Sequence, residues 1–213
     1  MTDSYETLSV GKYEKLLQAR ADYEQKDVNA LNLAILAILT DRSEEELLDL
    51  KLPEFRALTD RAGFLRTAPR PEPVARRYRL KEYDLRPVTD VRRMTAAQYI
   101  DFQTFAREET GCTAELLSCF LIPRGRRYND GYDIREVQAA IRESLPITRG
   151  LGLLAFFLKK SRQSTISTLR SSIRTMKRTK PTPQTLKAMS MAELSMALLK
   201  SGDGSLMSMP LLS

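Results

Sequence analysis

The sequence predicts a mainly α-helical protein made of a duplicated helical unit, with a small β-hairpin or extended linker between the copies and a helical C-terminal arm. Two pairs of matching segments carry this prediction. Segment 8–13 (LSVGKY) is echoed by 94–99 (MTAAQY), and segment 43–47 (SEEEL) by 133–137 (DIREV). Repeated helical units are typical of scaffolds and binding proteins rather than of enzymes.

Both copies also end alike. A Leu-Pro pair is followed by a Phe-Leu pair at Pro53 and Phe64 in the first copy, and at Pro146 and Phe157 in the second. The offset between the copies grows from 86 residues at Tyr13 to 93 at Pro53, because the second copy contains insertions. This alignment divides the chain into a first helical repeat, a linker or hairpin, a second helical repeat and a C-terminal arm, at residues 1–66, 67–93, 94–158 and 159–213.

The first copy predicts four helices. Ser9 can cap a helix with an apolar stripe at i, i+3 and i+4 that starts at Tyr13. Residues 28–39 are apolar on most sides, which indicates a buried helix. Ser43 and Glu46 fit a capping box, and Pro53 suits the first turn of a fourth helix that ends near Gly63.

The linker predicts a hairpin. Tyr78 and Leu80, then Tyr83 and Leu85, alternate with charged residues, and the break at 81–82 fits a tight turn. An extended linker is the alternative. In the second copy Thr95 and Gln98 form another capping box, and residues 116–122 are expected to repeat the buried helix. The helix that begins at the Thr95 capping box carries an apolar stripe made of Tyr99, Phe102, Phe105 and Ala106.

An insertion at 123–132 ends in an Asn-Asp-Gly-x-Asp run. It lacks the ligand order and the final glutamate of a calcium loop, so the sequence favours a glycine turn with Asp133 capping a helix that contains Glu136. Cys112 and Cys119 are seven residues apart on one expected helix. That spacing is too wide for a disulfide and indicates buried thiols.

The composition argues against an enzyme. The chain contains no histidine, which excludes Ser-His-Asp and Cys-His triads and the common zinc sites. No acidic pair is expected in an apolar setting that would raise a pKa. We therefore expect no catalytic residue, no metal and no cofactor. No apolar run reaches the length of a membrane helix, so no membrane partner is expected either.

Positive charge is concentrated in the arm. Residues 1–150 carry 24 Lys and Arg against 25 Asp and Glu, whereas 151–213 carry 10 against two. A narrow apolar seam with basic residues around it, followed by further methionines, predicts an amphipathic surface for an adaptable partner. Its expected contact residues are Lys159, Lys160, Ile166, Leu169, Arg170, Ile173, Arg174, Met176, Lys177, Arg178, Met189 and Met196.

Three stretches together resemble the small tail assembly chaperones of tailed bacteriophages. They are 8–13 with the apolar helix and 40–46 (TDRSEEE) that follow it, 94–103 (MTAAQYIDFQ), and 120–133 (FLIP to YNDGYD). The resemblance covers about residues 8–158, and the basic, methionine-rich end departs from it. It implies a mostly helical, non-enzymatic protein that coats the long tape-measure protein and delivers tail-tube subunits around it.

This resemblance predicts a phage morphogenesis factor in the cytoplasm of the bacterial host, with the virion as the alternative location. Its partners would be the tape-measure or tail-tube protein, with self-association as a further option. Two other functions stay open: a structural virion protein, and nonspecific nucleic-acid binding through the basic arm. The arm lacks aromatic residues beyond Phe157, so base stacking is not expected.

Overall fold

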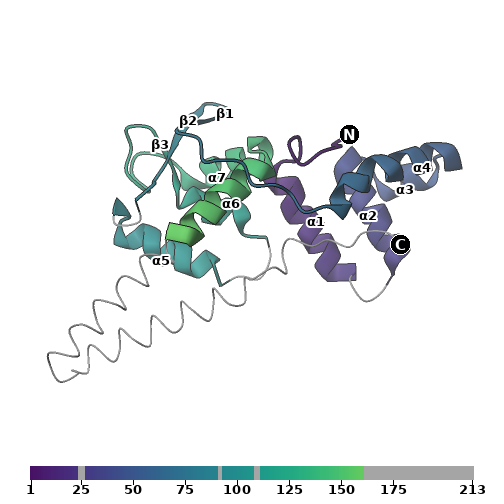
Figure 1. Ribbon diagram of the computed structural model, residues 1–213, viewed down its shortest axis with the longest axis horizontal. Helices are drawn as coiled ribbons and strands as arrows, with labels where there is room; N and C mark the ends of the chain where they lie inside the picture. The colour runs from purple at the N-terminus through teal and green to yellow at the C-terminus, as the bar shows by residue number, and fades with distance from the viewer. Residues whose placement is uncertain (24–26, 91–92, 108–110, 161–213) are drawn as a thin grey trace, which may run out of the picture.

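The computed structural model describes residues 1–23, 27–90, 93–107 and 111–160. As predicted, these residues are mostly helical and include a small antiparallel sheet (Figure 1). The elements are α1 (Val10–Tyr23), α2 (Val28–Thr40), α3 (Glu44–Leu48), α4 (Leu52–Arg61), the 3-10 helix η1 (Ala62–Arg66), β1 (Tyr78–Leu80), β2 (Tyr83–Pro87), α5 (Ala96–Phe105), α6 (Thr113–Ser118), β3 (Leu121–Pro123), α7 (Ile134–Ser144) and a helix at 147–160. In the described residues no helix is both long and apolar enough to cross a bilayer.

Local capping signals set where the helices begin. The Ser9 hydroxyl accepts a hydrogen bond from the Lys12 backbone N–H at the start of α1 (3.3 Å). Ser43 and Glu46 form the predicted capping box of α3, and Pro53 lies in the first turn of α4. The Ser9 and Ser43 hydroxyls accept hydrogen bonds from backbone N–H groups that have no partner inside the helix. Pro53 has no N–H, so it leaves no unpaired donor at its position. The predicted helix starts in the first copy are therefore confirmed.

Helix α1 contacts elements of both predicted repeats, residues 1–66 and 94–158. It packs against α2 on one side and against α6 and α7 on the other. Its N-terminal end is also tied to the junction after α7: the Val10 N–H donates to the Leu145 carbonyl (2.9 Å), and the Ile147 N–H donates to the Leu8 carbonyl (2.8 Å). These hydrogen bonds join backbone segments that are more than 130 residues apart in the chain, so the two predicted repeats form one packed body.

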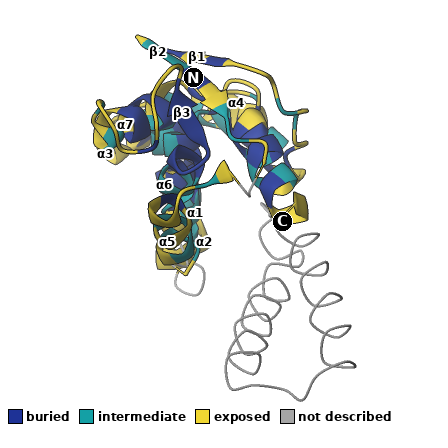
Figure 2. Ribbon diagram, turned by 90° about the vertical axis from the view of Figure 1, so that its left-hand side faces the viewer, coloured by how far each residue is buried: buried dark blue, intermediate teal, exposed yellow. Residues whose placement is uncertain are grey.

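The apolar core runs through both halves. It includes Tyr13 and Leu39 from the first half and Leu85, Phe120 and Phe157 from the second, all of them buried. In Figure 2 the buried colour continues from α1 through α6 to β3, whereas α4, and α5 apart from Gln98, are half-buried or exposed.

The hairpin prediction is confirmed. Tyr78 pairs with Leu85 across β1 and β2, and Lys81 takes a left-handed conformation in the turn (φ 51°). A third strand, β3, adds to β2 by pairing Leu85 with Pro123. The prediction that 116–122 repeats the buried helix is wrong, because α6 ends at Ser118 and the chain turns into β3. The open edge of β2 supplies the hydrogen bonds that hold this segment extended.

The segment before the hairpin packs against the 147–160 helix. The Glu72 N–H donates to the Thr148 carbonyl (2.9 Å), and the Thr148 hydroxyl donates to the Glu72 carboxylate (2.6 Å). At Gly152 the main chains come so close that an added Cβ would overlap the Glu72 carbonyl oxygen. The linker is therefore an integral part of the body.

The expected burial of Tyr99 is wrong. Its proposed counterpart Tyr13 is buried, but Tyr99 is 41% exposed. Helix α5 is held instead by Gln98, which completes the predicted capping box with Thr95 and donates from Nε2 to the Cys119 carbonyl (3.0 Å). Because Gln98 occupies the inward position, Tyr99 turns to the surface. The matched positions thus differ in environment, and the duplication stays a prediction.

Candidate functional site

The 147–160 helix carries the first of the residues predicted to bind a partner. Lys159 and Lys160 are exposed, and Nζ of Lys160 lies 5.8 Å from the centroid of the Phe156 ring, within the range of a cation–π contact. The others lie outside the described residues: Ile166, Leu169, Arg170, Ile173, Arg174, Met176, Lys177, Arg178, Met189 and Met196. The structure therefore describes only the base of the predicted arm.

An aromatic stack anchors this base. The Phe157 ring lies parallel to Phe120, with centroids 3.6 Å apart and 11° between the planes. Phe156 meets Phe157 edge-on at 5.4 Å, and Phe102 of α5 lies 5.2 Å from Phe120. Edge-on and tilted pairs at this range, such as Phe156 with Phe157 and Phe102 with Phe120, add to the free energy gained by burial. Helix α5 and the end of the 147–160 helix are thus held on the same ring, Phe120.

Apolar side chains remain exposed on both of these helices. On α5, Ile100 is 61% exposed next to the partly exposed Tyr99; we call these two residues the α5 surface. Leu158 is 48% exposed on the 147–160 helix. Single exposed apolar residues are common in soluble proteins. An adjacent exposed Tyr-Ile pair on a helix that shares its anchor with the base of the arm is a candidate contact for another protein.

A second exposed apolar pair lies at the other end of the body. Leu48 ends α3 and Leu52 begins α4, and both are more than half exposed. Figure 1 places α3 and α4 far from α5. This pair stands among acidic residues, with Glu44, Glu45 and Asp49 all exposed. It provides a matched reference for experiments on the α5 surface.

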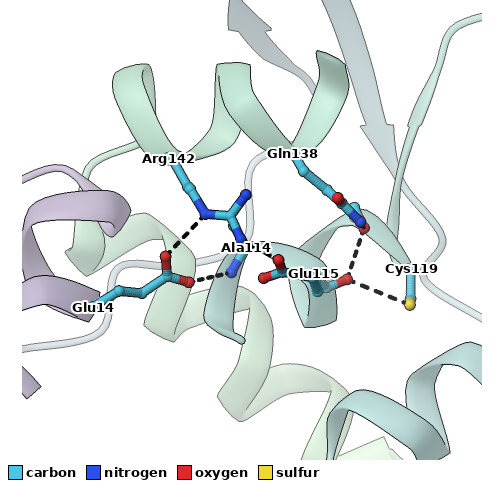
Figure 3. Close-up of polar contacts among 7 residues, drawn as sticks. Glu14, Ala114, Glu115, Cys119, Gln138 and Arg142 are labelled. Carbon is cyan, nitrogen blue, oxygen red and sulfur yellow. Dashed lines mark hydrogen bonds and ion pairs between the residues drawn. The ribbon is translucent and has the colours of Figure 1, made fainter. Parts of the chain in front are cut away.

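A charged cluster ties α1, α6 and α7 together (Figure 3). The buried Glu14 carboxylate accepts hydrogen bonds from the Ala114 N–H (2.7 Å) and from Nε of Arg142 (3.1 Å). Arg142 also donates from Nη2 to Glu115. The Oε2 atom of Glu115 is buried and has no hydrogen-bond partner. One guanidinium therefore serves two carboxylates in a mostly enclosed setting.

Burial raises the pKa of Glu14, against the opposing effects of the Ala114 N–H and Arg142. The expectation from the sequence concerns acidic pairs in an apolar setting, whereas the raised pKa belongs to the single carboxyl of Glu14 beside Arg142. A raised carboxyl pKa is a feature of general acids. Here, however, the two donors to the Glu14 carboxylate, the Ala114 N–H and Nε of Arg142, belong to two other helices. The arrangement is that of a structural cross-link.

Hydrogen bonds continue from this cluster along α6. The Glu115 carbonyl accepts from the Ser118 hydroxyl (2.7 Å) and from Sγ of Cys119 (3.4 Å). Nε2 of Gln138 on α7 donates to the Ser118 hydroxyl (3.2 Å). In Figure 3 this chain of contacts and the Arg142 contacts lie on the same side of α7. It satisfies polar groups between α6 and α7.

The Cys119 thiol is not poised for chemistry. Burial raises its pKa to about 12, so the thiol stays protonated at neutral pH, and the thiolate is the reactive form. Tyr128 lies 3.9 Å from Sγ and donates to the Asp101 carboxylate (2.7 Å). Burial and this hydrogen bond raise the pKa of Tyr128 as well. Cys119 is buried as predicted, but Cys112 is only half-buried at the start of α6.

The 129–133 run forms a turn and a helix cap. Asn129 takes a left-handed conformation (φ 54°), and its N–H donates to the Tyr132 hydroxyl (3.2 Å). Asp133 accepts from the Arg135 N–H (2.8 Å) and caps α7, as predicted. Within the described ranges, no group of three or more His, Cys, Asp or Glu side chains is arranged to hold a metal ion.

Comparison with known proteins finds no relative of this chain. No protein-family model, no curated protein and no solved structure matches the chain.

Proposed function

We propose that this chain is a non-enzymatic phage morphogenesis factor, a tail assembly chaperone that binds the tape-measure protein, tail-tube subunits or both. The observation that carries the proposal is the α5 surface: Tyr99 and Ile100 are exposed on a helix held by the same aromatic stack as the base of the arm. Helical clients bind through apolar side chains at helical spacing, and such a surface offers apolar contacts to them.

The rest of the described chemistry supports a binding role. Glu14 and Arg142 bond to groups on neighbouring helices, and the Cys119 thiol is held in its protonated form. The Glu14 contacts stabilise the body, and the protonated thiol of Cys119 is not the nucleophilic form. Lys159 and Lys160 are exposed on the helix that shares Phe120 with α5, so they would add positive charge near a client lying on the α5 surface.

A pull-down with matched variants tests this proposal. The full chain, carrying an affinity tag, is co-expressed with the tape-measure protein of the same phage. Tyr99→Ser with Ile100→Ser should weaken recovery of the client roughly tenfold or more, because apolar anchors dominate the energetics of interfaces. Leu48→Ser with Leu52→Ser changes a still more exposed apolar pair on α3 and α4 and should leave recovery unchanged.

Equal recovery by both double variants would reject the α5 surface as the contact. Failure of the unmodified chain to recover the client would reject the proposed function itself. Mass spectrometry of purified particles separates the chaperone from a structural virion protein. A chaperone should be absent or scarce there, whereas a stoichiometric amount would favour the structural role.

A further inference from the structure

The strand register gathers four arginines on one face of the small sheet. Arg79 pairs with Asp84 across β1 and β2, and the Arg124 N–H donates to the Asp84 carbonyl (2.8 Å). Residues directly opposite each other on antiparallel strands share a face. Arg79, Asp84 and Arg124 therefore form a row across the sheet.

A second row lies beside the first. Side chains alternate between faces with a period of two, so Arg77 and Arg86 lie on the same face as Arg79 and Asp84. Arg86 pairs with Ile122 of β3, which places Ile122 on this face too. We call Arg77, Arg79, Arg86 and Arg124 the arginine face.

The opposite face of the sheet belongs to the core. Tyr78, Leu80 and Leu85 are buried there, and β1 contacts α7. The four arginines of the arginine face are all exposed, whereas the β3 edge of this face is covered at the buried Ile122. Figure 2 shows β1 and β2 at the periphery of the molecule.

Asp84 only partly balances this charge. It binds Arg77 through two contacts, one of them from Nη2 to Oδ2 at 2.6 Å. This hydrogen bond, and then the charges of Arg124 and Arg79, lower the pKa of Asp84, so it stays ionised at neutral pH. The four guanidinium groups and the one carboxylate leave the arginine face with a net positive charge.

The chemistry of the face favours a phosphate partner over an acidic protein. A stable protein interface has an apolar centre surrounded by polar residues. The apolar member of this face, Ile122, is only 6% exposed. The large apolar residues exposed elsewhere in the described chain lie on α2, α3, α4, α5 and the 147–160 helix or at the N-terminus. Guanidinium groups match phosphate oxygens in geometry and charge.

We propose that the arginine face binds the phosphodiester backbone of nucleic acid without sequence specificity. Arg79, Arg86 and Arg124 make the contacts, while Arg77 stays with Asp84. The face offers arginines but no aromatic side chain for stacking, so phosphate contacts and the release of counterions would supply the affinity. This role is independent of binding to a tail protein.

Binding of a fluorescein-labelled 20-bp DNA duplex to the full chain, followed by anisotropy over a range of salt, tests the proposal. The triple variant Arg79→Gln, Arg86→Gln, Arg124→Gln should bind on the order of tenfold or more weakly at low salt. The slope of log K against log salt should fall by about 3. The control variant Arg42→Gln, Arg56→Gln, Arg66→Gln removes the same charge from exposed positions near α3, α4 and η1 and should keep the original slope.

Equal affinity and slope in the triple variant and the unmodified chain would overturn the proposal and assign any DNA binding to the arm. Equal losses in both variants would reduce the effect to net charge and would also overturn it. Poly-L-glutamate is the competing probe. If it binds more tightly than the duplex and depends on the same arginines, the face is a site for an acidic protein instead.

Discussion

Replacing Arg142 with leucine should destabilise the body by about 2–4 kcal/mol at pH 7. The change leaves the carboxylates of Glu14 and Glu115 without their cation. Unit charges about 4 Å apart attract by ~4 kcal/mol at the effective dielectric of a partly buried site, and breaking a buried pair typically costs about 3–5 kcal/mol. The estimate is lower here because the Arg142 side chain is 35% exposed and is partly screened by water.

The loss should depend on pH. The pKa of Glu14 is raised in the folded state, so protonation of its carboxyl favours folding. This contribution to the free energy of unfolding is fully present below the ordinary pKa of 4.5. It is lost as pH rises through the pKa of the folded state. Without Arg142 that pKa rises further. The gap between variant and unmodified chain should therefore be largest at pH 7 and shrink near pH 4.5.

Urea denaturation of both chains at the two pH values measures this gap. Arg149→Leu is the matched control, because Arg149 pairs with Glu72 where both side chains are exposed to solvent. Its loss should stay below ~1 kcal/mol. A loss under ~1 kcal/mol for Arg142→Leu, or an equal loss at both pH values, would refute the reasoning about the cluster.

Three further predictions concern packing and reactivity. Gly152→Ala should cost about 1–3 kcal/mol in the same denaturation assay, because its Cβ would overlap the Glu72 carbonyl; a neutral effect would mean that the linker moves freely. Phe157→Ala should cost about 3–5 kcal/mol, whereas Tyr99→Ala should cost under ~1 kcal/mol, and similar values for the two would contradict their assigned burial. Cys119 should resist a thiol reagent at pH 8 in the folded chain and react in urea, as followed by peptide mapping; rapid labelling of the folded chain would contradict its raised pKa.

Local signals were sufficient for much of the fold. The capping residues Ser43, Thr95 and Asp133 act on N–H groups two or three positions away, so a short stretch of sequence contains the whole interaction. The hairpin is similarly local, since Tyr78 and Leu85 are joined by a short turn. Such elements can be predicted from one sequence.

Contacts between distant residues could not be predicted in this way. The partners of Glu14 lie 100 and 128 residues away, at Ala114 and Arg142, and no local sequence pattern around Glu14 predicts them. Strand β3 has three residues and is stabilised by β2, far earlier in the chain. Tyr99 fits an apolar stripe, but the buried amide of Gln98 decides which side of α5 faces inward. Arg77 and Arg79 alternate with the apolar residues of β1, but placing Arg86 and Arg124 on the same face requires the register of the sheet.

The proposed function implies that the chain comes from a tailed phage, and co-expression of the unmodified chain with the tape-measure protein of that phage tests it most directly. The measured quantity is the soluble fraction of the tape-measure protein and its co-elution with the chain in size-exclusion chromatography. A chaperone should raise that soluble fraction several-fold and elute with its client in one complex. If the chain is folded and soluble while the tape-measure protein stays insoluble and elutes without it, the proposed function is wrong.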